Sequence, residues 1–326
     1  PTVAALLEED RPVTALVRST ACLPPVLVDG AASGRIRIVE GDLNDPDSLG
    51  RAVTGIETVI HLATGGGDTW AEVERAMVRG SESLARAAHA AGVKRFIYVS
   101  SVAALYLGHD AKSRLIEDDE PLDPQPEARP VYARGKMAAE EALLALHRAE
   151  GLGLVIVRPG VVLGTDTPMQ HSGIGLWVRD NHCVGWGLGD NHLPLVWVND
   201  VADALCRTAT HEGNGLLGHT LNLCARVPLS GQEVVARLRE TTGRDLHFHP
   251  RSLAVSQLME IGKWVVKVVG RKPAPFPSWR DLKSRALVPP FSSRTAREAL
   301  GWEPCEDPDE FMARITGQPP SAEPPA

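Results

Sequence analysis

The stretch Phe96-Ile97-Tyr98-Val99-Ser100-Ser101 is an apolar run that ends in two hydroxyl side chains, and Tyr132-Ala133-Arg134-Gly135-Lys136 follows it along the chain. An apolar run of this length is typical of a buried strand. Tyr132 and Lys136 are four residues apart, so in a helix they share one face. An ammonium group there favours the phenolate and lowers the pKa of the tyrosine. The pattern indicates proton transfer at a carbinol or carbonyl oxygen, coupled to hydride transfer with a nicotinamide.

Strand and helix patterns alternate around these two stretches. Buried strands are predicted over residues 13–18, 36–40, 58–62, 96–100 and 154–158. Helices are predicted over residues 2–9, 70–91 and 132–150, with a further helix start at 44–47. This alternation predicts an α/β fold with a doubly wound parallel sheet. Ligands of such sheets bind at the carboxyl ends of the strands, where most of the candidate site residues named below are found.

The alternation ends near residue 165. Residues 165–195 are rich in Gly, His, Trp and Asn and are predicted as long loops, and Ser230 with Glu233 predicts a capping box at a helix start. The basic, apolar segment 262–272 is expected to be a core-facing helix rather than a membrane-surface helix. We expect a cofactor-binding domain over 1–164, a mainly substrate-binding region over 165–316 with segments that return to the first domain, and a disordered tail over 317–326.

Composition excludes several classes of partner. The 326 residues carry a net charge of -7, which argues against nucleic acid. No apolar run reaches the roughly 18 residues of a membrane span. The five cysteines are scattered and form no CxxC pair, which predicts free thiols in a reducing, cytoplasmic compartment. His171, His182, Cys183 and His192 lack a metal-ligand spacing, so no metal is expected.

Residues 96–101 and 132–136, together with Arg158-Pro159-Gly160, resemble the extended short-chain dehydrogenase/reductases, also called the NAD-dependent epimerase/dehydratase family. Further matches occur in family order at 41–43, 59–63, 197–202 and 300–304. The resemblance implies a Rossmann domain with a smaller C-terminal substrate domain, a small-molecule substrate and a homodimer.

The same resemblance implies residue roles. Tyr132 matches the catalytic acid/base, Lys136 the residue that lowers its pKa and binds the nicotinamide ribose, and Ser101 the ligand of the substrate oxygen. The implied cofactor-binding residues are Arg18, Asp42, Leu43, Leu62, Ala63, Thr64, Ser100, Lys136, Pro159 and Gly160. The implied substrate contacts are His171, His182 and Trp186. Arg18 ends the strand that reads the adenosine ribose, and an arginine there favours the 2′-phosphate of NADP over NAD.

Three departures from the family pattern stand out. The Gly-rich phosphate loop and the first strand would precede residue 1, so we expect a truncated sequence and a sheet with unpaired strand edges in its interior. Met77 stands where Asn is frequent, which puts the family's catalytic water relay in doubt. Gly135 stands where Ser or Thr is frequent; glycine costs a helix about 1 kcal/mol, and it indicates a close backbone approach.

The first functional hypothesis is an NAD(P)-dependent oxidoreductase or epimerase that acts on a nucleotide sugar or a related polar sugar derivative. Dehydration is not expected, because Ser101 is followed by Val102-Ala103-Ala104 rather than by an Asp-Glu pair. The second hypothesis is an NADPH-dependent ketone or aldehyde reductase of the dihydroflavonol-reductase or hydroxysteroid-dehydrogenase type. The third is a redox-dead dinucleotide-binding protein.

Overall fold

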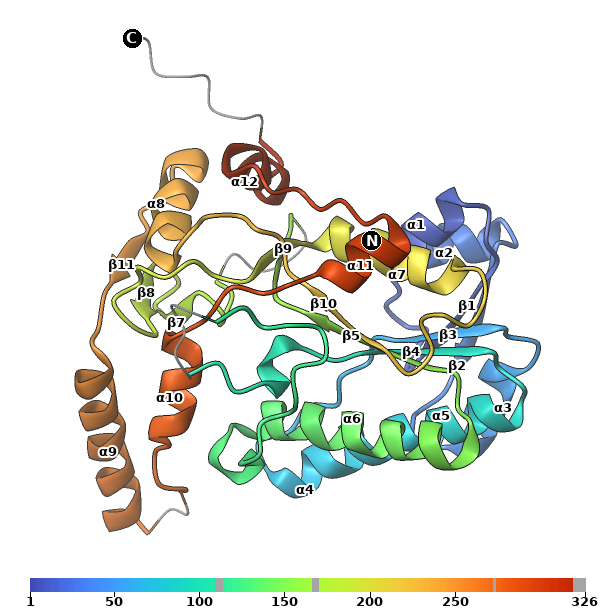
Figure 1. The fold of residues 1–326 in the computed structure, drawn as a ribbon, viewed down its shortest axis with the longest axis horizontal. Coiled ribbons are helices and arrows are strands. Elements are labelled where there is room, and N and C mark those ends of the chain that lie inside the picture. Colours follow the sequence, from blue (N-terminus) through green and yellow to red (C-terminus); the bar gives the residue numbers. More distant parts are fainter. Residues whose placement is uncertain (109–113, 166–169, 272–273, 319–326) are drawn as a thin grey trace.

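The computed structural model describes residues 1–108, 114–165, 170–271 and 274–318. Its central sheet has four parallel strands in the order β10 (Thr220–Leu223), β5 (Leu154–Pro159), β4 (Arg95–Val99) and β3 (Thr58–His61) (Figure 1). The side chains of β4 are buried almost completely, as the apolar run predicted. The predicted parallel α/β architecture is confirmed.

The N-terminal strands form a separate parallel pair. β1 (Val13–Val17) pairs with β2 (Ile36–Glu40), and between them runs α2 (Pro25–Ala32). No ladder joins β1 to β3 among the described residues, and every residue of β1 is only partly buried. The prediction of unpaired strand edges inside the sheet is therefore confirmed at this boundary.

Helices cover both faces of the sheet (Figure 1). One face packs against α3 (Pro46–Val53), α5 (Gly80–Ala90) and α6 (Val131–Glu150). The other packs against α7 (Val198–Thr210) and α11 (Arg294–Leu300), with α1 (Thr2–Glu8) lying on α7. α7 and β10 belong to the C-terminal half of the sequence, yet β10 pairs with β5 and α7 packs on β3 and β4.

The helix predicted over 70–91 contains a π-helical interruption. It runs as α4 (Trp70–Val73), the π-helical segment η1 (Glu74–Arg79) and then α5. Gly135 of α6 lies directly against this interruption: a Cβ atom there would come within 2.5 Å of Val73 Cγ1 and 2.9 Å of Met77 Sδ. Two departures from the family pattern thus form one contact, in which the bulk of Met77 occupies the space left by Gly135.

The substitution Gly135→Ala should destabilise the protein despite the better helix propensity of alanine. Overpacking costs about 1–3 kcal/mol, whereas the propensity gain is about 1 kcal/mol. Urea unfolding of the single variant and of Gly135→Ala combined with Val73→Ala measures this. The added methyl group should lower the free energy of unfolding less when Val73 is alanine. An equal loss with either residue at position 73 would refute the contact.

The C-terminal half corrects one prediction. Residues 165–195 contain a β-hairpin, β7 (Gly175–Val178) and β8 (His182–Gly185), which β11 (His247–His249) extends, while β6 (Val161–Leu163) pairs with β9 (Leu195–Trp197). The hairpin turns at Arg179 and Asp180, which both adopt positive φ. Because Arg-Asp is not a usual turn dipeptide of this type, the sequence did not signal the hairpin. The capping box predicted at Ser230 is confirmed at α8 (Gly231–Thr242).

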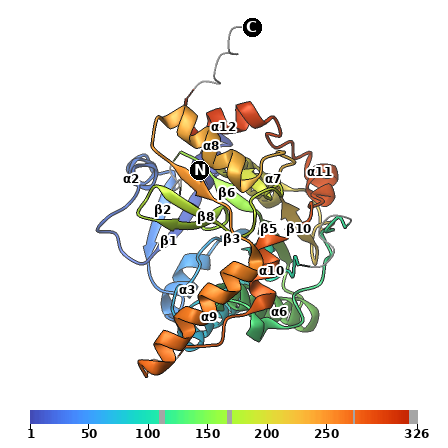
Figure 2. The same cartoon turned by 90° about the vertical axis from the view of Figure 1, so that its left-hand side faces the viewer.

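The prediction of a core-facing helix over 262–272 is wrong. The segment belongs to α9 (Leu253–Val269), which lies at the outer edge of the molecule and packs along α10 (Trp279–Ala286) (Figures 1 and 2). Val266 and Val269 are 72% and 78% exposed. In the part of the chain that the structure describes, no helix combines the length and apolarity needed to cross a membrane. After α12 (Pro308–Thr316), most of the tail predicted as disordered (319–326) lies outside the described residues.

Candidate active site

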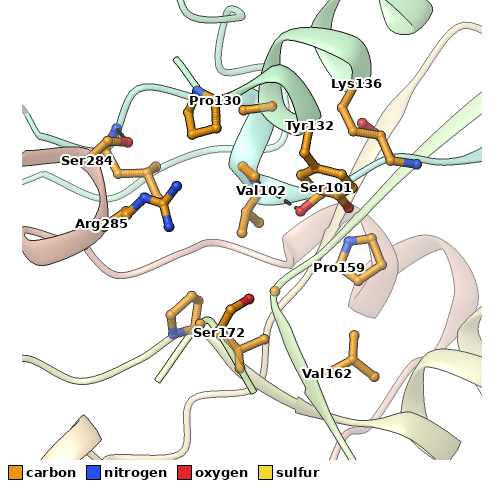
Figure 3. Close-up of a pocket in the computed structure, with 18 of the residues that line it drawn as sticks. Ser101, Val102, Pro130, Tyr132, Lys136, Pro159, Val162, Ser172, Ser284 and Arg285 are labelled. Atoms are coloured by element: carbon orange, nitrogen blue, oxygen red, sulfur yellow. Dashed lines mark hydrogen bonds between the residues drawn. The ribbon is translucent and has the colours of Figure 1, made fainter. Parts of the chain in front are cut away.

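A cavity of about 610 Å³ opens where β3, β4 and β5 end at their carboxyl termini (Figure 3). It brings the three predicted catalytic side chains together on one wall. Ten of the predicted site residues line it: Leu62, Thr64, Ser100, Ser101, Tyr132, Lys136, Pro159, Gly160, His171 and Trp186.

Ser101 is held by the turn that follows β4. Its Oγ accepts a hydrogen bond from the backbone N–H of Ala103 at 3.1 Å and caps the short 3₁₀ turn η2 (Val102–Ala104). Tyr132 lies beside Ser101 in the cavity and is 44% exposed (Figure 3). Partial burial raises the pKa of Tyr132 above its ordinary value, and a hydrogen bond with the Ser101 side chain offsets part of that rise. Tyr132 is therefore a neutral phenol near pH 7.

Lys136 is almost fully buried one helical turn further along α6. Its Nζ donates to the carbonyl oxygen of Val99 at 2.7 Å and lies 4.9 Å from the ring centroid of Tyr98 but 6.0 Å from that of Tyr132. Burial lowers the pKa of Lys136 to about 8. Burial and the Ser101 hydroxyl are the causes of the shift in the pKa of Tyr132 here, and the role predicted for Lys136 in lowering that pKa stays a prediction.

A buried ion pair, missed from the sequence, lies next to Lys136. The carboxylate of Glu140 accepts two parallel hydrogen bonds from Arg158, with Nη2 at 2.6 Å and Nε at 3.0 Å, and a third from Ser100 Oγ. Glu140 and Arg158 are both at most 4% exposed. Tyr132, Lys136 and Glu140 follow one another at four-residue steps along α6, which is the one signal that could have identified Glu140.

The substitution Glu140→Gln should destabilise the protein by about 3–5 kcal/mol, because it leaves the Arg158 guanidinium buried without a counter-charge. Urea unfolding measures this. The matched control is Glu141→Gln, the exposed neighbour on α6, which should stay within about 0.5 kcal/mol of wild type. If the two variants were equally stable, the ion pair between Glu140 and Arg158 would not contribute to stability.

A second network fixes α10 at the cavity rim. Arg129 pairs with Asp123 at 2.8 Å and with Asp281 of α10 at 3.4 Å, and Asp281 also pairs with Arg285 at 2.9 Å. The Arg285 guanidinium lies 4.7 Å from the ring centroid of Trp186. Figure 3 shows Arg285 across the cavity from Tyr132. The sequence did not point to Asp281 and Arg285 because α10 carries no recognisable motif.

Five predicted site residues do not line this cavity. Arg18 and Asp42 are exposed near the ends of β1 and β2. Hydrogen bonds from the backbone and side chain of Asn44 lower the pKa of Asp42, and the charge of Arg18 adds a smaller effect. Leu43 packs in the helical core, and Ala63 is exposed after β3. Because these residues lie outside the cavity, their predicted contacts with the cofactor stay predictions.

His182 does not line this cavity, and its predicted contact with substrate stays a prediction. It lies on β8, where its Nδ1 is 2.9 Å from Nε2 of His249 and its ring stacks on His247 at 5.1 Å. Within the described ranges, no group of three His, Cys, Asp or Glu side chains is arranged to hold a metal ion. All five cysteines are free thiols, as predicted.

A model of the NAD dependent epimerase/dehydratase family matches residues 2–224, which include the predicted catalytic trio of Ser101, Tyr132 and Lys136 and the strand ends around it. The chain belongs to this family. The predictions of family and fold class are thereby confirmed.

Curated relatives of this family member carry names of reductases and dehydrogenases. Cinnamoyl-CoA reductase 1 from Arabidopsis thaliana is 30% identical over 42% of this chain and 40% of its own length. A 3 beta-hydroxysteroid dehydrogenase/Delta 5-->4-isomerase from Mycobacterium tuberculosis is 29% identical over 50% of this chain and 43% of its own length. The 2-alkyl-3-oxoalkanoate reductase of Stenotrophomonas maltophilia is 27% identical over 73% of this chain and 70% of its own length. The matches to the first two span less than half of those proteins.

Solved structures share the fold at lower identity. MoeE5 in complex with UDP-glucose and NAD superposes with a TM-score of 0.70 at 24% identity, over 97% of this chain and 93% of that one. DesIV, a dTDP-glucose 4,6-dehydratase from Streptomyces venezuelae with NAD and TYD bound, superposes with a TM-score of 0.72 at 20% identity. The superposition covers 97% of this chain and 91% of that one. At these identities the comparison establishes the fold.

Proposed function

We propose that this family member is an NAD(P)H-dependent reductase of ketones or aldehydes whose carbon skeleton is mainly apolar. The observation that carries the proposal is the wall beside the catalytic trio, which is largely apolar and includes Val102, Ala103, Leu107, Val162, Leu193 and Val288. Apolar walls with few polar groups suit an apolar ligand held at one polar end. A nucleotide sugar, our first hypothesis, would leave many hydroxyl groups facing this wall without partners. The names of the three curated relatives support the same choice.

The cavity fits the nicotinamide half of a dinucleotide. Strand ends at Leu62, Ser100 and Pro159 surround it, and the Val99 carbonyl accepts one of the three protons of the Lys136 ammonium, which leaves donors for ribose hydroxyl groups. The bound cofactor would supply the hydride. We further propose that NADP is preferred through Arg18, and that the protein is a cytoplasmic homodimer.

The polar end of the cavity can carry out the proton transfer. Ser101 donates a hydrogen bond to the carbonyl oxygen of the substrate and orients it. Tyr132, whose pKa is raised, is protonated and gives its proton to the same oxygen as the alkoxide forms. Lys136 orients the ribose and stabilises the resulting phenolate.

The substitution Tyr132→Phe should lower kcat/KM by about 10²–10⁴-fold, the usual range for a lost general acid. Oxidation of NADPH is followed with 3-ketosteroids, 2-alkyl-3-oxoalkanoates and UDP-glucose as separate substrates. Turnover of an apolar ketone by wild type, but not of UDP-glucose, supports the proposal, and the reverse preference would refute it. NADPH fluorescence provides the control, since the phenylalanine variant should still bind cofactor.

The substitution Arg18→Glu should weaken NADPH binding by about tenfold or more, because a charge-assisted hydrogen bond to phosphate contributes about 1.5–3 kcal/mol. NADH binding should change little. Parallel fluorescence titrations with the two cofactors measure the ratio. An unchanged ratio would show that Arg18 does not read the 2′-phosphate.

A further inference from the structure

The outward face of α9 is apolar, the reverse of an ordinary surface helix. Exposed side chains recur at three- and four-residue steps, which places them in one stripe along the helix. The stripe consists of Val255, Leu258, Met259, Val265, Val266 and Val269, all between 42% and 78% exposed. The opposite side, which includes Ser256 and Trp264, faces the protein. Figures 1 and 2 show α9 at the outer edge of the molecule, with α10 packed along it.

The segment that follows α9 packs against the inner side of the helix, opposite the stripe. It folds back so that Trp264 Nε1 donates to the Ala274 carbonyl at 3.1 Å and Gln257 Nε2 to the Pro277 carbonyl at 3.0 Å. Phe276, whose ring centroid is 5.2 Å from that of Trp264, remains 61% exposed. These hydrogen bonds attach the inner side of α9 to the segment that follows it, and the stripe lies on the other side of the helix.

The charge of this region differs from that of the rest of the chain. Residues 253–279 contain four basic residues and one acidic residue in a protein of net charge -7. The acidic residue, Glu260, is paired with Lys263 at 2.6 Å. Lys263 and Lys267 are exposed along one border of the apolar stripe, and Arg271 follows its end. An apolar stripe bordered by cations is typical of helices that lie in a bilayer interface.

We propose that α9 docks through its apolar stripe on the surface of a lipid bilayer that contains anionic headgroups. A second copy of the chain is a weaker candidate, because a two-fold interface would bring the same lysines towards one another. α10, which packs along α9, also carries Asp281, Ser284 and Arg285 of the cavity wall. Docking would therefore place the cavity close to the source of an apolar substrate. Only this last point rests on the proposed function.

Co-sedimentation of the full chain with vesicles tests the proposal. Vesicles of phosphatidylcholine mixed with phosphatidylglycerol should bind the protein more tightly than pure phosphatidylcholine, by about fivefold for each cation at the surface. The double substitution Leu258→Gln with Val266→Gln should weaken binding at least tenfold, because it removes two side chains from the buried stripe. Lys267→Glu should abolish most of the preference for the anionic vesicles.

The matched control is Val28→Gln, which changes an exposed valine of α2, 50% exposed and on a different helix. It should bind vesicles as wild type does. The proposal is wrong if wild type binds neither vesicle, or if the double variant binds as tightly as wild type. It is also wrong if α9 mediates a dimer that the double variant dissociates. Vesicle binding requires no substrate, so it can fail while the reductase activity stands, and the reverse also holds.

Discussion

The buried ion pair between Glu140 and Arg158 is the interaction on which the site depends. Two full charges removed from water are tolerated only where the geometry is nearly ideal and the remaining hydrogen-bonding groups are satisfied. Here the guanidinium meets the carboxylate with two parallel bonds, and Ser100 supplies another. The pair joins α6 to β5 and, through Ser100, to β4. Any rotation or sliding of α6 would break it, so the pair also fixes where Tyr132 and Lys136 point.

The other side of α6 is constrained by volume rather than by charge. At Gly135, the space that a side chain would need is occupied by Val73 and Met77 of the interrupted helix opposite. A π-helical segment changes which side chains face a neighbour, and such segments are frequent at functional sites. The family's usual polar residue at position 77 would meet no hydrogen-bonding partner in Gly135. The two unusual residues are therefore better understood as a packing pair than as two independent losses of catalytic function.

The sequence predicted those parts of the site that periodicity and motif spacing can encode. Strand ends follow from apolar runs, and the shared face of Tyr132 and Lys136 follows from helical geometry. Glu140 lies on the same face, but a carboxylate in a helix is usually solvated, and its partner Arg158 is distant in the chain. The direction in which α9 faces could not be predicted either. Hydropathy shows that one side of a helix is apolar, but the surrounding fold decides whether that side meets the core.

α10 is attached to the rest of the protein by ion pairs that do not involve α9. Asp123 is fully buried and holds Arg129 and Arg280, and Asp281 of α10 in turn holds Arg129 and Arg285. This chain of alternating charges attaches α10 to the loop before α6, so the cavity wall does not rely on whatever covers the apolar stripe of α9. A lipid surface could therefore bind or release α9 without rearranging the residues around the substrate. The rim of the cavity is built on charge pairing, whereas the surface beside it is left apolar, and this division would keep the proposed catalysis and the proposed docking in separate parts of one structure.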